Sequence, residues 1–204
     1  MLSSRSPSAS SQGASLITPL NHSQEWWSAL TEEPPTAVIE DTEVSLTGVA
    51  AEKIYQGGKY GELEKGKLKL MPVEALYLVK QGKLKVVDPE GVPLDFQELV
   101  SRFSEKDPLI WARFLIYQDL RRRGYTVKAG YGKGAVFRVY RRGAKIGSEP
   151  ARYLVFGVAE GETFDVAFLA KIADEARSSQ KDLILAVIDR QGDITYYDVS
   201  RVSL

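Results

Sequence analysis

Apolar residues in this chain fall into short runs that glycine, proline and charged turns separate. In the first half, residues 37–49 contain two strand-like runs, and residues 59–70 alternate apolar with polar side chains like a hairpin. Apolar residues then recur at helical spacing from Pro72 and stop at Gly82, which predicts a helix. A further strand and a helix capped by Asp95 are expected to complete this half.

The second half begins with an amphipathic run over 112–123, which ends at Gly124 and predicts a helix. The apolar runs 136–140, 153–158 and 183–188 predict strands, with a helical segment between the last two. One more strand-like run follows a turn rich in aspartate and glycine. The order of elements predicts an α+β chain. We expect a small mixed α/β N-terminal domain, followed by a C-terminal domain with a mixed β-sheet flanked by helices.

Changes in composition divide the chain into three parts. Residues 1–23 are rich in serine and poor in apolar side chains. Such a stretch cannot bury enough apolar surface to offset its ordering entropy, so we expect it to be disordered. A polar segment that ends in proline, 104–108, marks a boundary further along. The prediction is a disordered tail at 1–23, an N-terminal domain at 24–106 and a C-terminal domain at 107–204.

Composition excludes several kinds of chemistry. Lysine and arginine total 27 and match the 27 aspartates and glutamates, which argues against a surface that is basic all over but leaves room for a local basic face. The absence of cysteine excludes disulfides, thiolate zinc sites and cysteine nucleophiles. His22, the single histidine, lies in the polar N-terminal segment. Without a membrane-length apolar run or a signal-peptide core, the chain is expected to be soluble and cytoplasmic.

Several short motifs follow one another in a characteristic order along the chain. In the first half these are Tyr60-Gly61, Pro72-Val73-Glu74-Ala75-Leu76-Tyr77-Leu78 and Gly82-Lys83-Leu84. In the second half they are Asp119-Leu120-Arg121-Arg122-Arg123-Gly124-Tyr125, Phe137-Arg138-Val139-Tyr140, Tyr153-Leu154-Val155 and Leu185-Ala186-Val187-Ile188-Asp189. Through their order and spacing over residues 40–204, the chain resembles the archaeal tRNA-splicing endonucleases, which excise introns from precursor tRNA. The resemblance implies a nuclease-like C-terminal domain.

The resemblance also implies a site and a mechanism. Enzymes of this family cut RNA without a metal or other cofactor, using a tyrosine, a histidine and a lysine. One group removes the proton of the 2′-hydroxyl beside the scissile phosphate, another protonates the leaving 5′-oxygen, and the lysine stabilises the charge that develops on the phosphate. The matching positions here are Tyr140, Pro150 and Lys181. Proline has no titratable group, so we expect this triad to be inactive.

A second departure from the family pattern also points to an inactive site. Catalytic members carry an arginine about seven residues before the lysine, which helps to sandwich a base of the RNA, and Asp174 stands there in this chain. Tyr140 and Lys181 also have simpler interpretations, as a strand tyrosine and as a solvated lysine at the end of a helix. Glu149 is the candidate for a displaced acid, since burial can raise the pKa of a carboxyl group.

Two kinds of contact surface are predicted. The arginines of two clusters, Arg121, Arg122, Arg123, Arg141 and Arg142, either bind RNA phosphates or form solvated faces. Asp189 and Asp193 belong either to a simple turn or, as the resemblance implies, to an acidic loop that enters a basic cleft on a neighbouring dimer. The following strand would pair two subunits edge to edge, through Ile194, Tyr196, Tyr197, Val199 and Val202.

These observations favour a structural subunit without catalytic activity. The predicted assembly is a heterotetramer with two such subunits and two catalytic subunits of a tRNA-splicing endonuclease, which meets precursor tRNA as a complex. Two alternatives stay open: a catalytic subunit that works without the usual histidine, and a stand-alone tRNA-binding protein.

Overall fold

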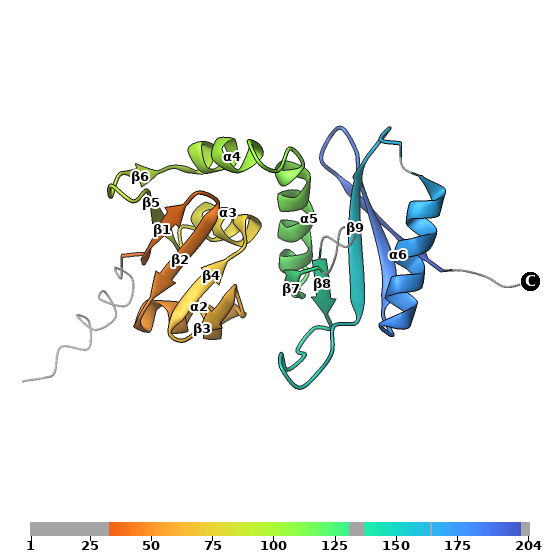
Figure 1. Cartoon of the computed structure of the whole chain (residues 1–204), viewed down its shortest axis with the longest axis horizontal. Helices are drawn as coiled ribbons and strands as arrows, with labels where there is room; N and C mark the ends of the chain where they lie inside the picture. Colours follow the sequence, from red (N-terminus) through yellow and green to blue (C-terminus); the bar gives the residue numbers. More distant parts are fainter. Residues whose placement is uncertain (1–32, 131–136, 164, 201–204) are drawn as a thin grey trace, which may run out of the picture. The chain divides into compact units, whose positions relative to one another are not determined.

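The computed structural model describes residues 33–130, 137–163 and 165–200 (Figure 1). Contacts along the chain divide it into residues 1–33 and 34–204, and every element described below belongs to the second unit. The predicted disordered tail, His22 and Val202 lie outside the described residues. Among those described, no helix is both long and apolar enough to cross a membrane.

The first half of the unit is built on a six-stranded sheet in the order β3-β4-β2-β1-β5-β6. Its neighbouring strands are antiparallel except β1 and β5, which are parallel. Alternate side chains are buried, for example Leu68 and Leu70 of β4, as the alternating sequence of residues 59–70 predicts. The strands are β1 (Thr36–Glu40), β2 (Glu43–Thr47), β3 (Glu62–Glu64), β4 (Lys67–Leu70), β5 (Lys85–Val87) and β6 (Pro93–Leu94).

Three helices accompany this sheet: α2 (Val49–Gly58), α3 (Pro72–Lys80) and α4 (Phe96–Ser104). The helix predicted after Pro72 is confirmed, with the proline in its first turn. The predicted cap of α4 is confirmed too: the Asp95 carboxylate accepts a hydrogen bond from the backbone N–H of Glu98 at 2.8 Å. In return, the backbone N–H of Asp95 donates to the Glu98 carboxylate at 2.7 Å, which completes a capping box.

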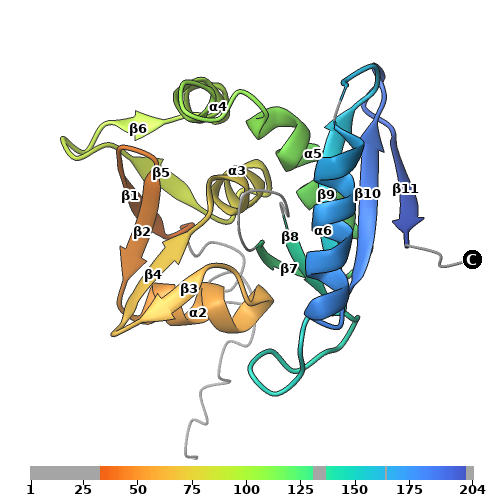
Figure 2. The ribbon, with the colours of Figure 1, turned by 45° about the vertical axis from the view of Figure 1, so that its right-hand side comes forward.

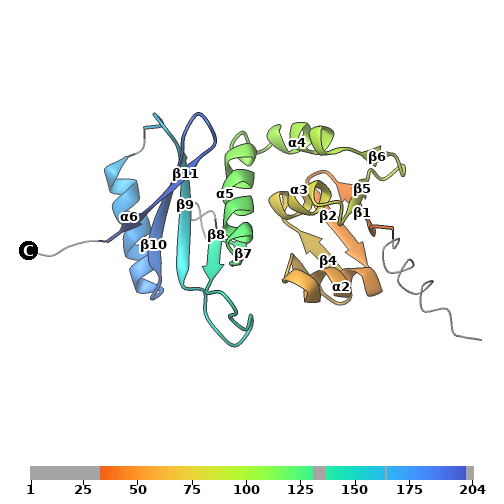
Figure 3. The same cartoon turned by 180° about the vertical axis from the view of Figure 1, so that it is seen from behind.

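The second half is a five-stranded mixed sheet in the order β11-β10-β9-β8-β7. β9 and β10 are parallel, and the other neighbouring pairs are antiparallel. Helix α6 makes the crossover between the parallel strands (Figure 2), and α5 lies on the other side of the sheet (Figure 3). The elements are α5 (Ile110–Arg122), β7 (Thr126–Ala129), β8 (Phe137–Tyr140), β9 (Tyr153–Ala159), α6 (Val166–Ser178), β10 (Asp182–Ile188) and β11 (Ile194–Val199). The predicted α+β class is confirmed.

Helix α5 contributes to the packing of both halves. It contacts α3 and α4 as well as β7, β9 and β10, and its buried Phe114 and Tyr117 belong to one cluster with apolar residues of both sheets. The sheet accommodates the helix at Gly157, where an added Cβ atom would lie 2.4 Å from the Cδ1 atom of Ile116. The predicted boundary after residue 106 falls between α4 and α5. Since one buried core crosses it, separate domains stay a prediction.

A buried polar network also joins the two halves. Glu74 is fully buried, and its carboxylate accepts hydrogen bonds from the backbone N–H groups of Gly61 and Met71, both at 2.9 Å. The Lys128 ammonium, from β7, donates to the carbonyl of Gly61. Burial raises the pKa of Glu74 and lowers that of Lys128, because each charge has lost most of its hydration. One glycine residue therefore links charges from both halves.

Candidate functional site

The ends of three neighbouring strands lie together at one end of the C-terminal sheet. β8 ends at Tyr140 and runs antiparallel to β9, while β9 and β10 run parallel from Tyr153 and Asp182. The end of β8 and the starts of β9 and β10 therefore lie side by side. Two backbone hydrogen bonds continue this arrangement beyond the strands. Arg152 N–H donates to the carbonyl of Val139 at 2.9 Å, and Asp182 N–H donates to the carbonyl of Arg152 at 3.1 Å.

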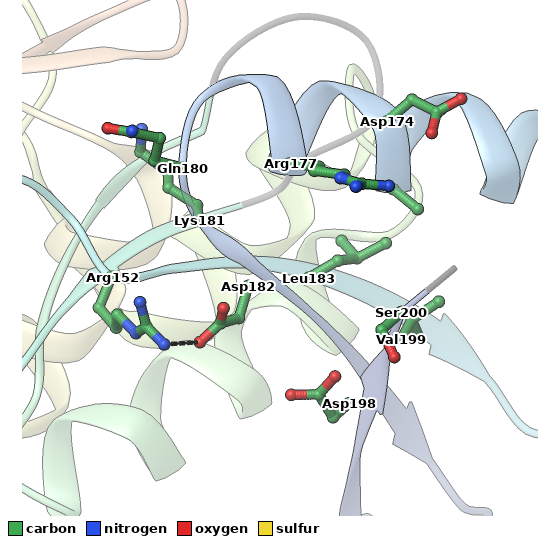
Figure 4. A pocket seen from close by; sticks show the side chains of 11 residues that line it. Arg152, Asp174, Arg177, Gln180, Lys181, Asp182, Leu183, Asp198, Val199 and Ser200 are labelled. Atoms are coloured by element: carbon green, nitrogen blue, oxygen red, sulfur yellow. Dashed lines mark ion pairs between the residues drawn. The ribbon is translucent and has the colours of Figure 1, made fainter. Parts of the chain in front are cut away.

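Two adjoining hollows lie at these strand ends. The larger, of about 380 Å³, contains Lys181 (Figure 4), and the smaller, of about 250 Å³, contains Pro150. Arg152 and Gln180 line both hollows. The fold therefore brings Tyr140, Pro150 and Lys181 to one end of the sheet, although they are far apart in sequence.

The three side chains differ in their surroundings. Tyr140 is only 8 % exposed and lies on β8 opposite Thr126, so it is a strand tyrosine that is buried. Pro150 is exposed. The half-buried Lys181 donates from its ammonium to the carbonyl of Ser179 at 2.8 Å, at the C-terminal end of α6. A cation is favourable at that end of a helix dipole, which agrees with the simpler interpretation of Lys181.

The larger hollow has no excess of positive charge. Its lining contains three cations, Arg152, Arg177 and Lys181, and three carboxylates, Asp174, Asp182 and Asp198. Figure 4 shows Arg152 and Asp182 paired across the hollow, with their charged atoms 2.7 Å apart. Because the charges cancel, this hollow has little electrostatic attraction for an RNA phosphate.

Glu149 directly precedes Pro150 in the sequence. It lines the smaller hollow, and its carboxylate accepts a hydrogen bond from the backbone N–H of Lys145 at 2.9 Å. The side chain is exposed. An acidic group is thus present next to the proline, and the interpretation of Glu149 as a displaced acid stays a prediction.

The predicted RNA-binding arginines fall into two groups. Arg121 is directed into the protein: its guanidinium donates to the carbonyl of Gly58 at 2.9 Å and to that of Tyr125 at 3.2 Å, and lies over the ring of Tyr60 at 4.4 Å. The hydrogen bond from Arg121 to Gly58 joins the two halves of the unit, and the sequence did not predict this contact. The other four are exposed at the surface: Arg122, Arg123, Arg141 and Arg142. Contact of these five arginines with RNA stays a prediction.

The turn between β10 and β11 is organised by Asp189. Its carboxylate accepts hydrogen bonds from the backbone N–H groups of Gln191 and Asp193, at 2.8 and 2.9 Å. Asp193 and Arg190 are exposed, so the turn carries two acidic charges and one basic charge. Asp189 therefore shapes the loop, and the side chain of Asp193 is exposed for contact with a partner. Insertion into a neighbouring dimer stays a prediction.

β11 forms an edge of the C-terminal sheet, and its tyrosines face opposite ways. Tyr196 is turned toward α5, where its hydroxyl donates to Asp119 at 2.8 Å, whereas Tyr197 is 53 % exposed. Ile194 and Val199 are half-buried. Subunit pairing through this strand stays a prediction.

Within the described part of the chain, no three histidine, aspartate or glutamate side chains are grouped to hold a metal ion.

Comparison with known proteins agrees with this architecture. The model of the tRNA intron endonuclease N-terminal domain matches residues 36–100, and that of the tRNA intron endonuclease catalytic C-terminal domain matches residues 110–196. The chain belongs to the tRNA intron endonuclease family. The first match spans β1 to α4, and the second runs from α5 into β11.

Archaeal relatives resemble this family member over most of their length. The tRNA-splicing endonuclease of Thermococcus gammatolerans is 38 % identical over 149 residues, which cover 73 % of this chain and 86 % of the relative. That of Methanothermobacter thermautotrophicus is 36 % identical over 149 residues, 72 % of this chain and 85 % of the relative. That of Pyrococcus furiosus is 39 % identical over 140 residues, 69 % of this chain and 79 % of the relative.

Two residues of the candidate site in this tRNA intron endonuclease family member were not found by sequence reasoning. Arg152 and Arg177 line the larger hollow together with Lys181. Arg152 stands two residues after Pro150 and directly before β9, so its place at a strand end could have indicated it. Arg177 is on the last turn of α6, four residues before Lys181, and no motif pointed to it.

Proposed function

We propose that this chain is the structural, catalytically inactive subunit of a heterotetrameric tRNA-splicing endonuclease, with two copies joined to two catalytic chains. The observation that carries the proposal is Pro150, which occupies the position where the family pattern has a histidine, near the strand ends that carry Tyr140 and Lys181. Proline can neither donate nor accept a proton, so the chain lacks one of the groups that metal-free RNA cleavage needs. The chain would support excision of introns from precursor tRNA by positioning a partner that has all three groups.

The described surfaces suit such an assembly. β11 is an edge strand, and an edge strand offers unpaired N–H and C=O groups to another chain. The turn at Asp189 and Asp193 would provide the second contact. The exposed arginines at Arg122 and Arg141 would meet tRNA phosphates in the complex, because phosphate contacts need only positive charge.

The proposal is tested by mixing this chain with a histidine-containing paralogue from the same genome. Size-exclusion chromatography with light scattering would give the mass, and a precursor-tRNA assay would give cleavage. We expect this chain to be inert by itself and the mixture to be an active tetramer of two plus two. Cleavage by the isolated chain would overturn the proposal. If that cleavage disappeared in Glu149→Gln, the displaced-acid alternative would replace it. An inert mixture that still binds tRNA would favour the stand-alone binding protein.

Restoring the missing group gives a second prediction. Pro150→His is expected to cut precursor tRNA about 100-fold faster than Pro150→Ala, since a positioned acid or base contributes about 10²–10⁴-fold. Both variants would be assembled with a partner whose own triad histidine is replaced, so that any cleavage comes from this chain. Adding Tyr140→Phe to Pro150→His should remove the gain. Equal rates for histidine and alanine would mean that Tyr140 and Lys181 are not placed for the reaction.

A further inference from the structure

A third hollow, of about 300 Å³, lies on the α5 side of the C-terminal sheet. Its floor is apolar: Ile184 of β10 lies opposite Val155 of β9, and Val139 of β8 is nearby. Tyrosine side chains form its walls, and we call it the tyrosine groove. The tyrosines are Tyr125, Tyr153 and Tyr196. Its volume is at the lower end of the range of about 300–1,000 Å³ that is usual for small-molecule sites.

The rings of the tyrosine groove are arranged for stacking. The Tyr125 and Tyr153 rings meet edge to face, with their centres 6.5 Å apart. A guanidinium lies over each outer ring: Arg142 is 5.0 Å from the centre of Tyr125, and Arg123 is 5.5 Å from that of Tyr196. Two of the three rings thus already hold a cation over their faces. Aromatic and guanidinium planes are the groups on which proteins stack unpaired RNA bases.

The rim of the tyrosine groove is positively charged. Arg123 forms an ion pair with Asp119, 2.7 Å between the charged atoms, and is balanced. Arg142, over the ring of Tyr125, forms no ion pair with any residue that the structure describes, which leaves one uncompensated charge beside the groove. An unpaired arginine beside aromatic walls complements a nucleic acid, because bases can stack on the rings while a phosphate meets the cation.

The tyrosine groove lies on the opposite face of the sheet from the hollow at Lys181. Val139 and Val155 belong to the core that packs on α5, whereas Leu183, which lines the hollow at Lys181, packs with residues of α6. Both hollows nevertheless involve the strand ends that meet beside Pro150. A strand of RNA that passes these strand ends could therefore reach either face of the sheet.

We propose that the tyrosine groove holds an unpaired base of single-stranded RNA, stacked against its tyrosine rings. Arg142 contacts the phosphate beside that base. The inference deepens the proposed function and rests on it for the identity of the RNA, which would be precursor tRNA. It adds a base-holding surface to a subunit whose cleavage site lacks a proton-transfer group.

The test measures binding of a fluorescent single-stranded oligouridylate to the full chain. Tyr125→Leu and Tyr153→Leu are expected to weaken binding about tenfold each, within the range found for loss of one base–aromatic stack. Tyr125→Phe keeps a ring and should bind like the original chain. Tyr55→Leu is the matched control, because Tyr55 is also half-buried with a lysine over its ring, Lys59 at 5.1 Å, but lies on α2. Thermal unfolding would verify that each variant folds.

Photocrosslinking provides the second measurement. An oligouridylate that carries 5-iodouridine should crosslink to tyrosines of the tyrosine groove, and mass spectrometry would locate the crosslinks. Unchanged affinity in both leucine variants, or crosslinks only elsewhere, would overturn the inference. So would a change of molecular mass in Tyr125→Leu, which would make the groove a contact between protein chains. Because these measurements use the isolated chain, their failure is distinct from failure of the mixed complex to assemble or cut precursor tRNA.

Discussion

Replacement of Glu74 by leucine is expected to lower the free energy of unfolding by about 2–6 kcal/mol, because each of two backbone donors left without its acceptor costs about 1–3 kcal/mol. Leucine has a similar volume, so the loss would come from polar groups. The backbone N–H groups of Gly61 and Met71 would lose their acceptor, and the Lys128 ammonium would lose the nearby negative charge. Urea unfolding of the original chain and the variant would measure the difference.

A double exchange separates the charge from the hydrogen bonds. With Lys128→Met added, no ammonium is left buried without a counter-charge, so the double variant should be more stable than the sum of the two single losses predicts. Glu43→Leu is the control: Glu43 pairs with Lys67 and Lys69 at the surface, and such pairs contribute about 1 kcal/mol or less. Strict additivity of Glu74→Leu and Lys128→Met would contradict the coupling of the two residues.

Alanine at position 61 is expected to destabilise the chain by about 2–6 kcal/mol. Gly61 has a φ of +64°, where a residue with a Cβ atom carries strain of about 1–3 kcal/mol. The added Cβ atom would also lie 2.4 Å from the backbone carbonyl oxygen of Lys69 and 2.8 Å from a methyl group of Leu68. A backbone atom of β4 cannot turn away as a side chain can, so crowding would add about 1–3 kcal/mol.

Gly66→Ala separates these two contributions. Gly66 has a φ of +78° but nothing within 4 Å of an added Cβ atom, so alanine there meets only the conformational strain. We expect the loss at Gly61 to exceed that at Gly66 by at least 1 kcal/mol, the lower value for overpacking. Thermal or urea unfolding would compare them. Equal losses at the two glycines would mean that β4 shifts without cost.

Local patterns predicted the elements well because their causes are local. The hairpin over residues 59–70 is confirmed as the antiparallel pair β3 and β4, and the helix that begins at Pro72 follows from its fixed φ. Asp95 caps α4 through a hydrogen bond to a residue three positions away. Patterns of this range need no knowledge of the rest of the chain. β6, two residues long, has no such pattern and was missed.

The network around Gly61 depends on contacts that no local pattern contains. Sequence reasoning treated Glu74, Lys128 and Arg121 as ordinary charged residues, whereas the structure buries the first two and directs the third inward. Arg121 and Lys128 acquire partners from the other half, 63 and 67 positions away, whereas Glu74 accepts a hydrogen bond from Gly61, 13 positions away in its own half. The strand-end site was easier to predict, since family motifs marked Tyr140 and Lys181. The tyrosine groove was missed although the family motifs contain Tyr125 and Tyr153, because its lining comes from four different strands, helix α5 and a loop.

The shared helix α5 has a consequence for synthesis on the ribosome. All six strands of the first sheet and its three described helices precede residue 110, so they leave the ribosome before the helix against which α3 and α4 pack. Lys128, which closes the network at Gly61, emerges later still. The nascent first half therefore exposes apolar surface on α3 and α4 until α5 arrives. A ribosome stalled before that point would carry a segment that chaperones recognise.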